Sequence, residues 1–399
     1  MNGRAFIPKE EFAQRLERMR REMAASGLDA LFVYGDEYRK ENLRYVSNYW
    51  PIFERGGFLT GTTGEPVVLC APEGEKLARE MSVWPDVRLL PDFLCVTVPD
   101  EIDYPLATYS SFKKLAEGLR ASGKLERLGV SGMEDMSESL LNRLRNAFGC
   151  ELVNADAILY KLRLTKSANE VACLKEAARI ADEGMKAIMQ ADIIGLTEVQ
   201  ACAIAEAKAR QEGAEHIIFT VFGSGERTAT IVGRPSTTKV IEDGDMIMLA
   251  LAVQYEGYVA TCEAPFAVGN YSEQTRRVID TLIRASAAGL PYLKAGQPMK
   301  NFVRAVRNYF REAGLSEYDV YPPLHGIGCA EAESPYPDEN TETLFEVGMT
   351  CNTDISLFGL PGGSNRIEEG FVITENGAQT LSPFVRAYCE DWIRKGDGR

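Results

Sequence analysis

The residues able to do chemistry gather in two stretches of the C-terminal half. The first, residues 250–269, predicts a hairpin, because two apolar β-rich runs flank a Tyr-Glu-Gly-Tyr turn at 255–258. Near its end Glu263 follows Thr261 by two positions, so strand alternation points both side chains to one face. A carboxylate among apolar neighbours must be paired, hydrogen-bonded or solvated at a pocket, since isolated burial of its charge is costly. Glu263 is therefore a candidate catalytic group, and pairing with a core arginine or lysine is the alternative.

The second stretch begins at His325, which follows a Tyr-Pro-Pro loop and precedes Gly326 and Gly328. Glycines pack little and suggest a close approach of the backbone to a ligand. We therefore expect a role in the site for His325, as a proton-transfer group or hydrogen-bond donor. The other histidine, His216, enters an apolar strand pattern and is expected to be an ordinary edge-of-strand residue. The acidic loop at 331–339 is interpreted as a solvated rim that would steer cations.

Two strand-like runs complete the second stretch, 349–357 with Asp354 and 366–374 with Glu368. Glu368 and Glu369 both follow Arg366, so the alternative is that one of them simply pairs with that arginine. Three converging carboxylates would repel one another unless a cation enters or a proton is shared. We therefore predict that the pocket binds a cationic group, and the prediction fails if the structure holds the three carboxylates apart.

The order of these motifs resembles the creatinase / prolidase / methionine-aminopeptidase family of "pita-bread" hydrolases. The matching pieces, in order, are Gly244-Asp245, Tyr255-x-Gly257-Tyr258, His325-Gly326-x-Gly328, Glu346-x-Gly348-Met349, Arg366-Ile367-Glu368 and the run 374–378. The resemblance implies an α/β N-terminal domain over 1–163 and an α+β C-terminal pita-bread domain over 164–399. It also implies a homodimer in which the N-terminal domain of one subunit helps to close the pocket of the other.

The chain departs from the metal-binding pattern of that family. Its metallopeptidases bind two metal ions through two Asp on the hairpin, the His and two later Glu. Here those positions hold Ala250, Thr261, His325, Asp354 and Glu368. A dinuclear site needs several carboxylate oxygens to bridge and neutralise the pair, and a methyl group and a hydroxyl cannot supply them. We therefore predict no metal ion and no other cofactor.

The metal-free branch typified by creatinase carries a Glu at the position of Glu263. Creatinase itself has a His where this chain has Val232 and an Arg where it has Tyr336, so creatine is not the expected substrate. The same branch includes ectoine hydrolases. The resemblance thus implies metal-independent hydrolysis of a C–N bond, of amidine, guanidine or amide type, in a small nitrogen-rich metabolite with a cationic group. A cyclic amidine such as ectoine is the leading example.

On this interpretation Glu263 orients the substrate cation, Asp354 assists, and His325 or Glu368 is the general base or acid. Five further residues are expected to bind substrate: Thr261, Tyr258, Tyr336, Asn352 and Phe222.

Three other functions stay open. A metallopeptidase of the prolidase type would hold one metal ion through His325, Asp354 and Glu368. A ligand-binding protein without activity would reuse the same fold, and a lyase would use a carboxylate base. Cys329, close to His325 in the sequence, is a weaker candidate nucleophile.

Composition limits the partners and the surroundings of the chain. The 399 residues carry a net charge of −14, which disfavours nucleic acid and anionic membranes. The start of the chain has no apolar targeting segment, and no run approaches the length of a membrane span. Nine scattered cysteines are typical of reduced thiols, so we expect a cytoplasmic protein.

The boundary between the two domains is expected just before Ser167, an N-cap with Glu170 as its capping-box partner. From there we predict one helix to about residue 190 and another over 198–210. In the N-terminal domain, strands and helices alternate, and 42–48 is predicted as a strand.

Overall fold

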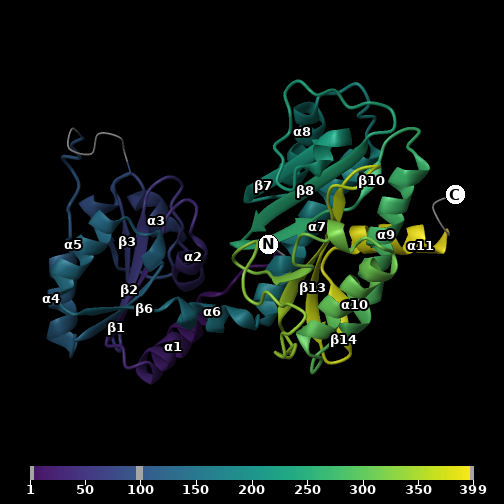
Figure 1. Ribbon diagram of the computed structural model, residues 1–399. Helices are drawn as coiled ribbons and strands as arrows, with labels where there is room; N and C mark the ends of the chain where they lie inside the picture. Colours follow the sequence, from purple (N-terminus) through teal and green to yellow (C-terminus); the bar gives the residue numbers. More distant parts are fainter. Residues whose placement is uncertain (1–3, 96–101, 396–399) are drawn as a thin grey trace. The chain divides into compact units, whose positions relative to one another are not determined.

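The computed structural model describes residues 4–95 and 102–395. The contacts divide the chain into two units, one of Ile7–Arg163 and one of Leu164–Arg399 together with the start of the chain (Figure 1). Each unit has its own sheets and its own packed interior, and each is described by itself. Among the described residues, no helix is long and apolar enough to cross a membrane.

The first unit is an α/β structure around a six-stranded mixed sheet of order β4-β3-β2-β1-β5-β6. Its strands are β1 (Ala30–Gly35), β2 (Gly56–Gly61), β3 (Val67–Cys70), β4 (Val87–Leu89), β5 (Arg127–Ser131) and β6 (Glu151–Asn154). Its helices are α1 (Lys9–Ala25), α2 (Glu41–Ser47), α3 (Glu75–Met81), α4 (Phe112–Ser122), α5 (Glu138–Phe148) and α6 (Asp156–Leu164). The alternation of strand and helix that the sequence predicts is confirmed.

One prediction in this unit is wrong. The stretch 42–48 forms helix α2 instead of a strand, and Asn48 ends the helix in the left-handed conformation with φ 66°. Every residue of α2 from Asn42 to Ser47 is buried, so that no exposed face distinguishes this helix. The stretch is short and mixes polar with apolar residues, and periodicity does not separate a buried strand from a buried helix at this length.

The second unit repeats the order of two helices followed by strands. The first half holds α7 (Ala168–Gln190), α8 (Glu198–Gln211) and the strands β7 (His216–Ser224), β8 (Met246–Tyr255), β9 (Tyr258–Cys262) and β10 (Phe266–Ala267). The second half holds α9 (Glu273–Gly289), α10 (Met299–Glu312) and the strands β11 (Leu324–Gly326), β12 (Thr350–Leu357), β13 (Asn365–Thr374) and β14 (Gly377–Thr380). Helix α11 (Pro383–Arg394) ends the described chain, and the predicted order of elements is confirmed.

Local sequence signals set the ends of these elements. Ser167 and Glu170 form the predicted capping box at the start of α7. The predicted hairpin is also confirmed, because β8 and β9 pair in antiparallel fashion around Glu256 and Gly257. Both turn residues have positive φ, 48° and 82°, as a tight hairpin turn requires.

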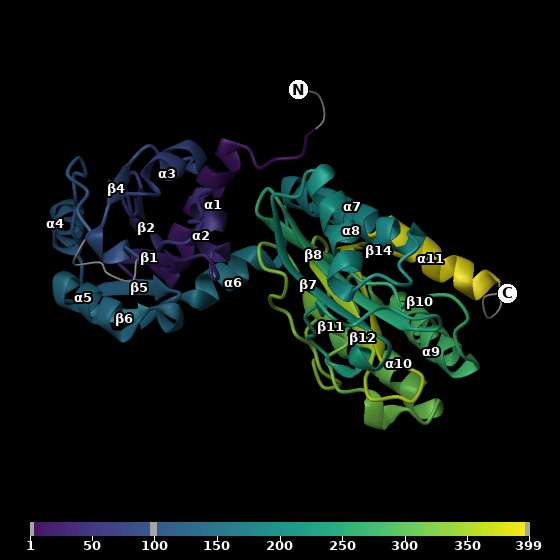
Figure 2. The same ribbon diagram turned by 90° about the horizontal axis from the view of Figure 1, so that it is seen from above.

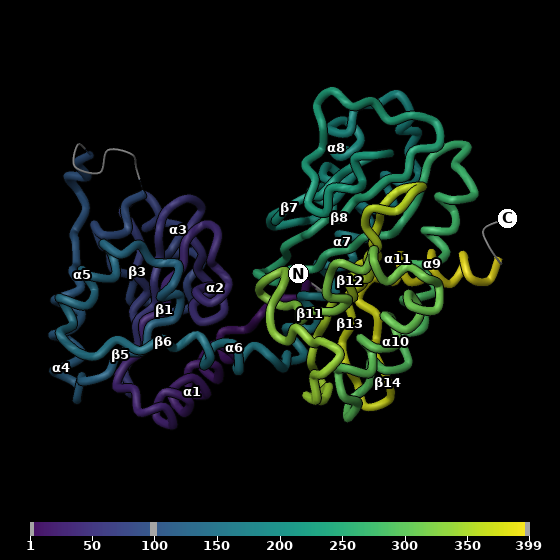
Figure 3. The backbone as a smooth tube through the Cα atoms, in the orientation of Figure 1, coloured from purple at the N-terminus to yellow at the C-terminus, as the bar shows by residue number. Residues whose placement is uncertain are grey.

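Each half of the second unit forms a four-stranded sheet. In the first sheet β8 lies between β7 and β9 and also pairs with β10, and in the second the order is β11-β12-β13-β14. Helix α7 packs on β8 and β9, and α8 packs on β7, as Figure 2 shows from above. The strands β11, β12 and β13 run side by side in the tube drawing of Figure 3. The candidate catalytic residues of the second unit lie where these two sheets meet.

Candidate active site

The two sheets are joined by a pair of backbone hydrogen bonds between Glu263 and Glu368. Glu263 N donates to Glu368 O at 3.1 Å, and Glu368 N donates to Glu263 O at 3.0 Å. Asp354 lies opposite Glu368 in the β12–β13 ladder, and His325 lies opposite Asn352 in the β11–β12 ladder. Opposite residues share a face of an antiparallel sheet, so these side chains meet on one face.

The hairpin follows the same alternation. Thr261 shares this face with Glu263, and its hydroxyl donates to Glu331 Oε1 at 3.1 Å. Cys262 points to the other face, where it lies against Asp182 of α7. The expectation that the Cys262 thiol points away from Glu263 is therefore confirmed.

Arg366 holds two of the three converging carboxylates. Its Nε lies 2.6 Å from Glu263 Oε2 and 3.0 Å from Glu368 Oε1. All three side chains are almost completely buried. Pairing with an arginine was an alternative for both Glu263 and Glu368. In the structure, the guanidinium of Arg366 pairs with both.

Burial dominates the electrostatics of these carboxylates. It raises the pKa of Glu263 to about 8, against the opposing charge of Arg366. Burial, with the negative charge of Glu368, raises the pKa of Asp354 well above its usual range. The pKa of Glu368 is also raised by burial. The predicted convergence of the three carboxylates is present, and Arg366 is the cation that lies among them.

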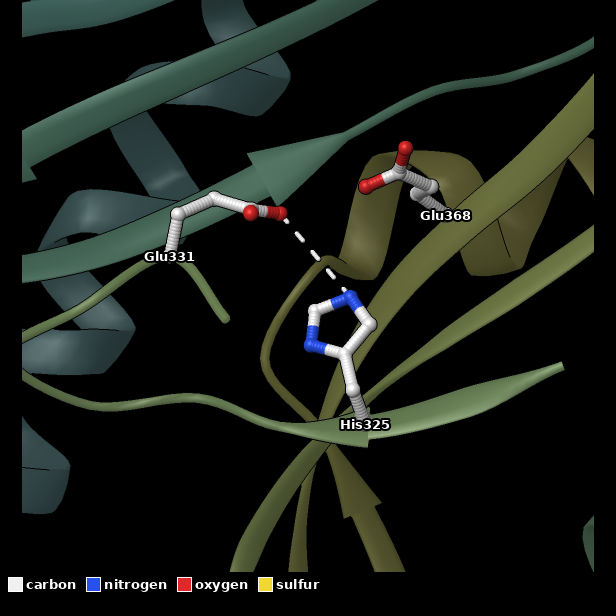
Figure 4. Close-up of side chains that lie close together, drawn as sticks. All are labelled: His325, Glu331 and Glu368. Atoms are coloured by element: carbon white, nitrogen blue, oxygen red, sulfur yellow. Dashed lines mark ion pairs between the residues drawn. The ribbon is translucent and has the colours of Figure 1, made fainter. Parts of the chain in front are cut away.

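A second group of side chains, which shares Glu368 with the first, has the donor set of a metal site. One ring nitrogen of His325 and one carboxylate oxygen each of Glu331 and Glu368 lie within 4.8 Å of one another. Figure 4 shows the three side chains pointing toward one another, with His325 Nε2 3.8 Å from Glu331 Oε1. His325 and Glu368 are buried and Glu331 is half-buried.

A backbone hydrogen bond fixes the tautomer of His325. Its Nδ1 lies 3.0 Å from the carbonyl oxygen of Gly326, and because a carbonyl only accepts, Nδ1 carries the proton. In the neutral ring Nε2 then has a free lone pair, on the side of Glu331. A histidine that donates its other N–H to a backbone carbonyl is the usual arrangement of a metal ligand.

Glu331 was not among the predicted site residues. It comes from the acidic loop that the sequence analysis interpreted as a rim, and Glu333 anchors that loop through a buried ion pair of 2.7 Å with Lys166. Gly326 and Gly328 pack against the same loop, where a Cβ at either position would collide with residues 333–334. The glycines after His325 thus make room for this loop rather than for a ligand. The sequence signal was a carboxylate six residues after the histidine.

These residues fit one divalent ion but not two. An imidazole nitrogen and two carboxylates are suitable donors for a single ion. Ala250 lies in an apolar cluster with Val221 and Met248, and the Thr261 hydroxyl is already bonded to Glu331. Asp354 is outside the three-residue group, so Glu331 takes the place that the metallopeptidase alternative gave to Asp354 as third candidate ligand.

Three of the predicted substrate-binding residues lie around this group. Asn352 donates to Glu368 Oε2 at 2.9 Å, and Thr261 bonds Glu331. The Tyr336 ring stacks on the His325 ring at 5.6 Å between centroids and is 53% exposed. Their contact with a substrate stays a prediction.

The other two predicted substrate-binding residues, Tyr258 and Phe222, do not lie beside His325, Glu331 and Glu368. Tyr258 is buried, and its hydroxyl donates to Glu170 Oε1 at 2.8 Å. Phe222 pairs with Leu249, on the opposite face of β7 from Val221, the residue that packs with Ala250. Neither side chain lies beside His325. Both were predicted from their positions in motifs, and a motif position does not tell which face of the strand a side chain is on.

Comparisons with known proteins agree with this architecture. Residues 172–375 match the model of Metallopeptidase family M24, and residues 15–165 match the Creatinase/Prolidase N-terminal domain. The chain is 26% identical to an Xaa-Pro dipeptidase of Pyrococcus furiosus over 376 residues, which are 94% of this chain and 99% of that protein. An Xaa-Pro dipeptidase of Pyrococcus horikoshii is 26% identical over 367 residues, 91% of this chain and 95% of that protein.

Solved structures show the same fold. An Xaa-Pro dipeptidase from Bacillus anthracis superimposes with a TM-score of 0.78 at 23% identity, covering 93% of this chain and 97% of that one. A prolidase from Pyrococcus horikoshii superimposes with a TM-score of 0.78 at 22% identity, covering 92% and 98%. The predicted creatinase-like N-terminal domain followed by a pita-bread domain is confirmed.

The predicted activity is wrong. The matched family is one of metallopeptidases, and the relatives that span the whole chain are Xaa-Pro dipeptidases. These findings overturn metal-independent hydrolysis of an amidine or guanidine, and with it the assignment to the ectoine-hydrolase branch and the exclusion of a metal ion. The prediction without a metal rested on the loss of the hairpin carboxylates and did not consider Glu331 as a donor. The findings favour the alternative of an Xaa-Pro-type metallopeptidase with a reduced metal site.

Proposed function

Because the chain belongs to Metallopeptidase family M24, we propose that it is a dipeptidase that hydrolyses a peptide bond with one divalent cation. His325, Glu331 and Glu368 would hold the ion. The observation that carries the proposal is the meeting of their donor atoms within 4.8 Å in a largely buried site. Xaa-Pro dipeptides are the first substrates to test, because the whole-length relatives bear that name.

The bound ion would supply Lewis-acid activation of the peptide carbonyl or of a water molecule. The residues of the chain orient the reaction around it. The hydrogen bond from His325 Nδ1 to Gly326 O holds the ring so that Nε2 faces the two carboxylates. Asn352 and Arg366 each contact Glu368, and thereby fix the direction of that carboxylate.

Glu263 is the proposed proton-transfer group. It lies next to Glu368 and is held by Arg366, and its pKa is raised to about 8 by burial. A carboxyl group with a pKa near the working pH exchanges protons efficiently and, when protonated, can give one to the leaving nitrogen. Its Oε1 has no hydrogen-bond partner among the described residues, so that this oxygen is available to a substrate.

The test is turnover of a panel of Xaa-Pro and other dipeptides, followed by release of the free amino acid. We expect hydrolysis with Mn²⁺, Co²⁺ or Zn²⁺ and its loss with a chelator, restored by adding the metal back. Hydrolysis unaffected by the chelator, or none with any metal, would refute the proposal. Ala-Pro and Pro-Ala, which have one composition and opposite order, show whether proline is required in the second position.

A further inference from the structure

Two buried oxygen atoms beside the candidate metal site lack any donor in the described part of the chain. They are Asp354 Oδ1 and Asn352 Oδ1, on side chains that are 3% and 0% exposed. Both residues belong to β12 two positions apart, so they share the face that carries His325 and Glu368. A buried acceptor without a donor costs about 1–3 kcal/mol, so two side by side call for a ligand.

The amide of Asn352 is oriented by its neighbour. Its Nδ2 donates to Glu368 Oε2 at 2.9 Å, and because an ionised carboxylate only accepts, the amide cannot be turned the other way. The oxygen is therefore the atom left over. Asn352 Oδ1 and Asp354 Oδ1 are thus two oxygen atoms that no described residue satisfies.

The nearby cationic side chains do not satisfy these acceptors. The Nε of Arg366 is directed to Glu263 and Glu368. Lys166 is paired with Glu333 at 2.7 Å, and both its side chain and that of Glu333 are buried. The missing donor must come from outside the described chain, and next to a carboxylate it is best supplied by a cation.

We propose that Asp354 and Asn352 bind the N-terminal ammonium group of the substrate. An ammonium has three N–H donors and one positive charge, so the carboxylate would pair with its charge and the amide oxygen would accept a second N–H. Asp354 lies opposite the candidate ligand Glu368, which places the free N-terminus next to the bond to be cleaved. The site would then act on peptides with a free N-terminus and would reject peptides whose N-terminus is acylated.

This inference rests on the proposed peptidase function, but it can be tested without turnover. The probes are Ala-Pro and propionyl-proline, which has the same shape without the amine. Binding of each to the chelator-treated full chain is measured by calorimetry. We expect Ala-Pro to bind about 10- to 100-fold more tightly, the range of a charge-assisted hydrogen bond.

Asp354→Asn should reduce that preference to less than about threefold, since the replacement keeps the shape and removes the charge. Asn352→Ala should weaken the preference as well. The control is Asp182→Asn, the same change at a buried aspartate of α7 whose Oδ1 also lacks a donor among the described residues but which accepts from Phe384 N, away from the site. That variant should keep the native preference.

Equal binding of the two probes by the native chain, binding of neither at millimolar concentration, or an unchanged preference in Asp354→Asn would overturn the inference. The metal-loaded protein separates the two proposals. If it hydrolyses propionyl-proline as fast as Ala-Pro, the peptidase proposal holds and the ammonium site is wrong. If the native chain prefers Ala-Pro but releases no proline with any metal, the ammonium site holds and the peptidase proposal fails.

Discussion

At the scale of single residues, Arg366 explains how buried carboxylates coexist at the junction of the sheets. Arg366 donates a hydrogen bond from Nε to Glu263 Oε2 and forms an ion pair with Glu368, so both carboxylates face a positive charge where water is excluded. Removing the guanidinium would leave buried charges without a partner, which costs far more than the ion pair itself contributes. Arg366 is therefore required for the arrangement, whatever its direct part in catalysis.

The proton-transfer role of Glu263 predicts a change in rate and in pH dependence. Glu263→Gln should lower kcat for dipeptide hydrolysis about 100- to 1000-fold with a smaller change in KM, since general acid–base catalysis has this magnitude. In the native enzyme kcat should fall as the pH rises through about 8, because the protonated carboxyl is then lost. The measurement is kcat against pH for both proteins.

The control for that experiment is Glu369→Gln. Glu369 is the next residue of β13, is also buried, and pairs with Arg386 on the other face. The Glu369→Gln variant should show the same fall in kcat at alkaline pH as the native enzyme. An unchanged kcat in Glu263→Gln would refute the role of Glu263 as a proton donor.

Residue identity alone predicted part of this site. The sequence singled out Glu263, His325, Asp354 and Glu368, and the structure gathers all four at the junction of the sheets. It did not single out Glu331, because an acidic loop on the surface of a chain with a net charge of −14 is ordinary. The loop that carries Glu331 is anchored by the ion pair of Glu333 with Lys166. These two residues are 167 positions apart in the sequence, so no local pattern indicates the contact.

At the scale of elements, the loop that carries Glu331 is anchored by backbone hydrogen bonds and by a buried ion pair. Gly326 N donates to Pro335 O at 2.8 Å, and Glu333 N donates to Gly326 O at 2.9 Å, so that the loop folds back on β11. The buried pair of Lys166 and Glu333 ties it to the start of the second unit. Glu331 belongs to this anchored loop, and its carboxylate accepts a hydrogen bond from the Thr261 hydroxyl.

Loss of this anchor should weaken metal binding. Lys166→Met removes the ammonium from a buried pair, so Glu333 should turn toward solvent and carry the loop with it. Metal affinity, measured by competition with a chelating dye, should fall about 10- to 100-fold, the usual effect of losing a group that supports a ligand. Lys166→Arg should restore part of it.

The matched control is Lys239→Met. Lys239 pairs with Asp245 at 3.0 Å in the same unit, but outside the loop that carries Glu331. Its loss should change metal affinity less than about twofold. Equal effects of the two substitutions would show that the Lys166 pair contributes only general stability.

Most of the elements were predictable because local signals determine them. The capping box at Ser167 and the positive-φ turn at Glu256-Gly257 depend on neighbouring residues only, and both were found in the sequence. The helix that covers most of 42–48 was missed because so short a stretch carries no period long enough to identify it. The bridge between Glu263 and Glu368 joins two sheets, and nothing local marks it.

At the scale of the whole molecule, the proposed site would hold one ion beside the guanidinium of Arg366, where the metallopeptidases that the chain resembles bind two ions. Two metal-binding positions of the family are Ala250 and Thr261 here, and the positive charge of Arg366 lies among the carboxylates that remain. The predicted homodimer and its shared pocket stay predictions, which sedimentation of the full chain can test.

Metal should stabilise the protein, since an ion that binds only the folded state adds RT ln(1 + [metal]/Kd) to the free energy of unfolding. At 100 times Kd this is about 2.7 kcal/mol, enough to raise the Tm of a unit of this size by several degrees. Calorimetric scans with Mn²⁺ and with chelator measure the shift. His325→Ala should show no shift, and a shift equal to the native one would place the ion elsewhere.

The most direct test of the account is the metal content of the native chain and of Glu331→Gln. Each protein is equilibrated with Mn²⁺, passed through a desalting column and analysed for manganese and protein. We expect one ion per native chain and a large loss in Glu331→Gln, because on the proposed assignment this residue would supply a ligand in place of the missing hairpin carboxylates. Two ions per native chain, none, or an unchanged content in Glu331→Gln would contradict the account.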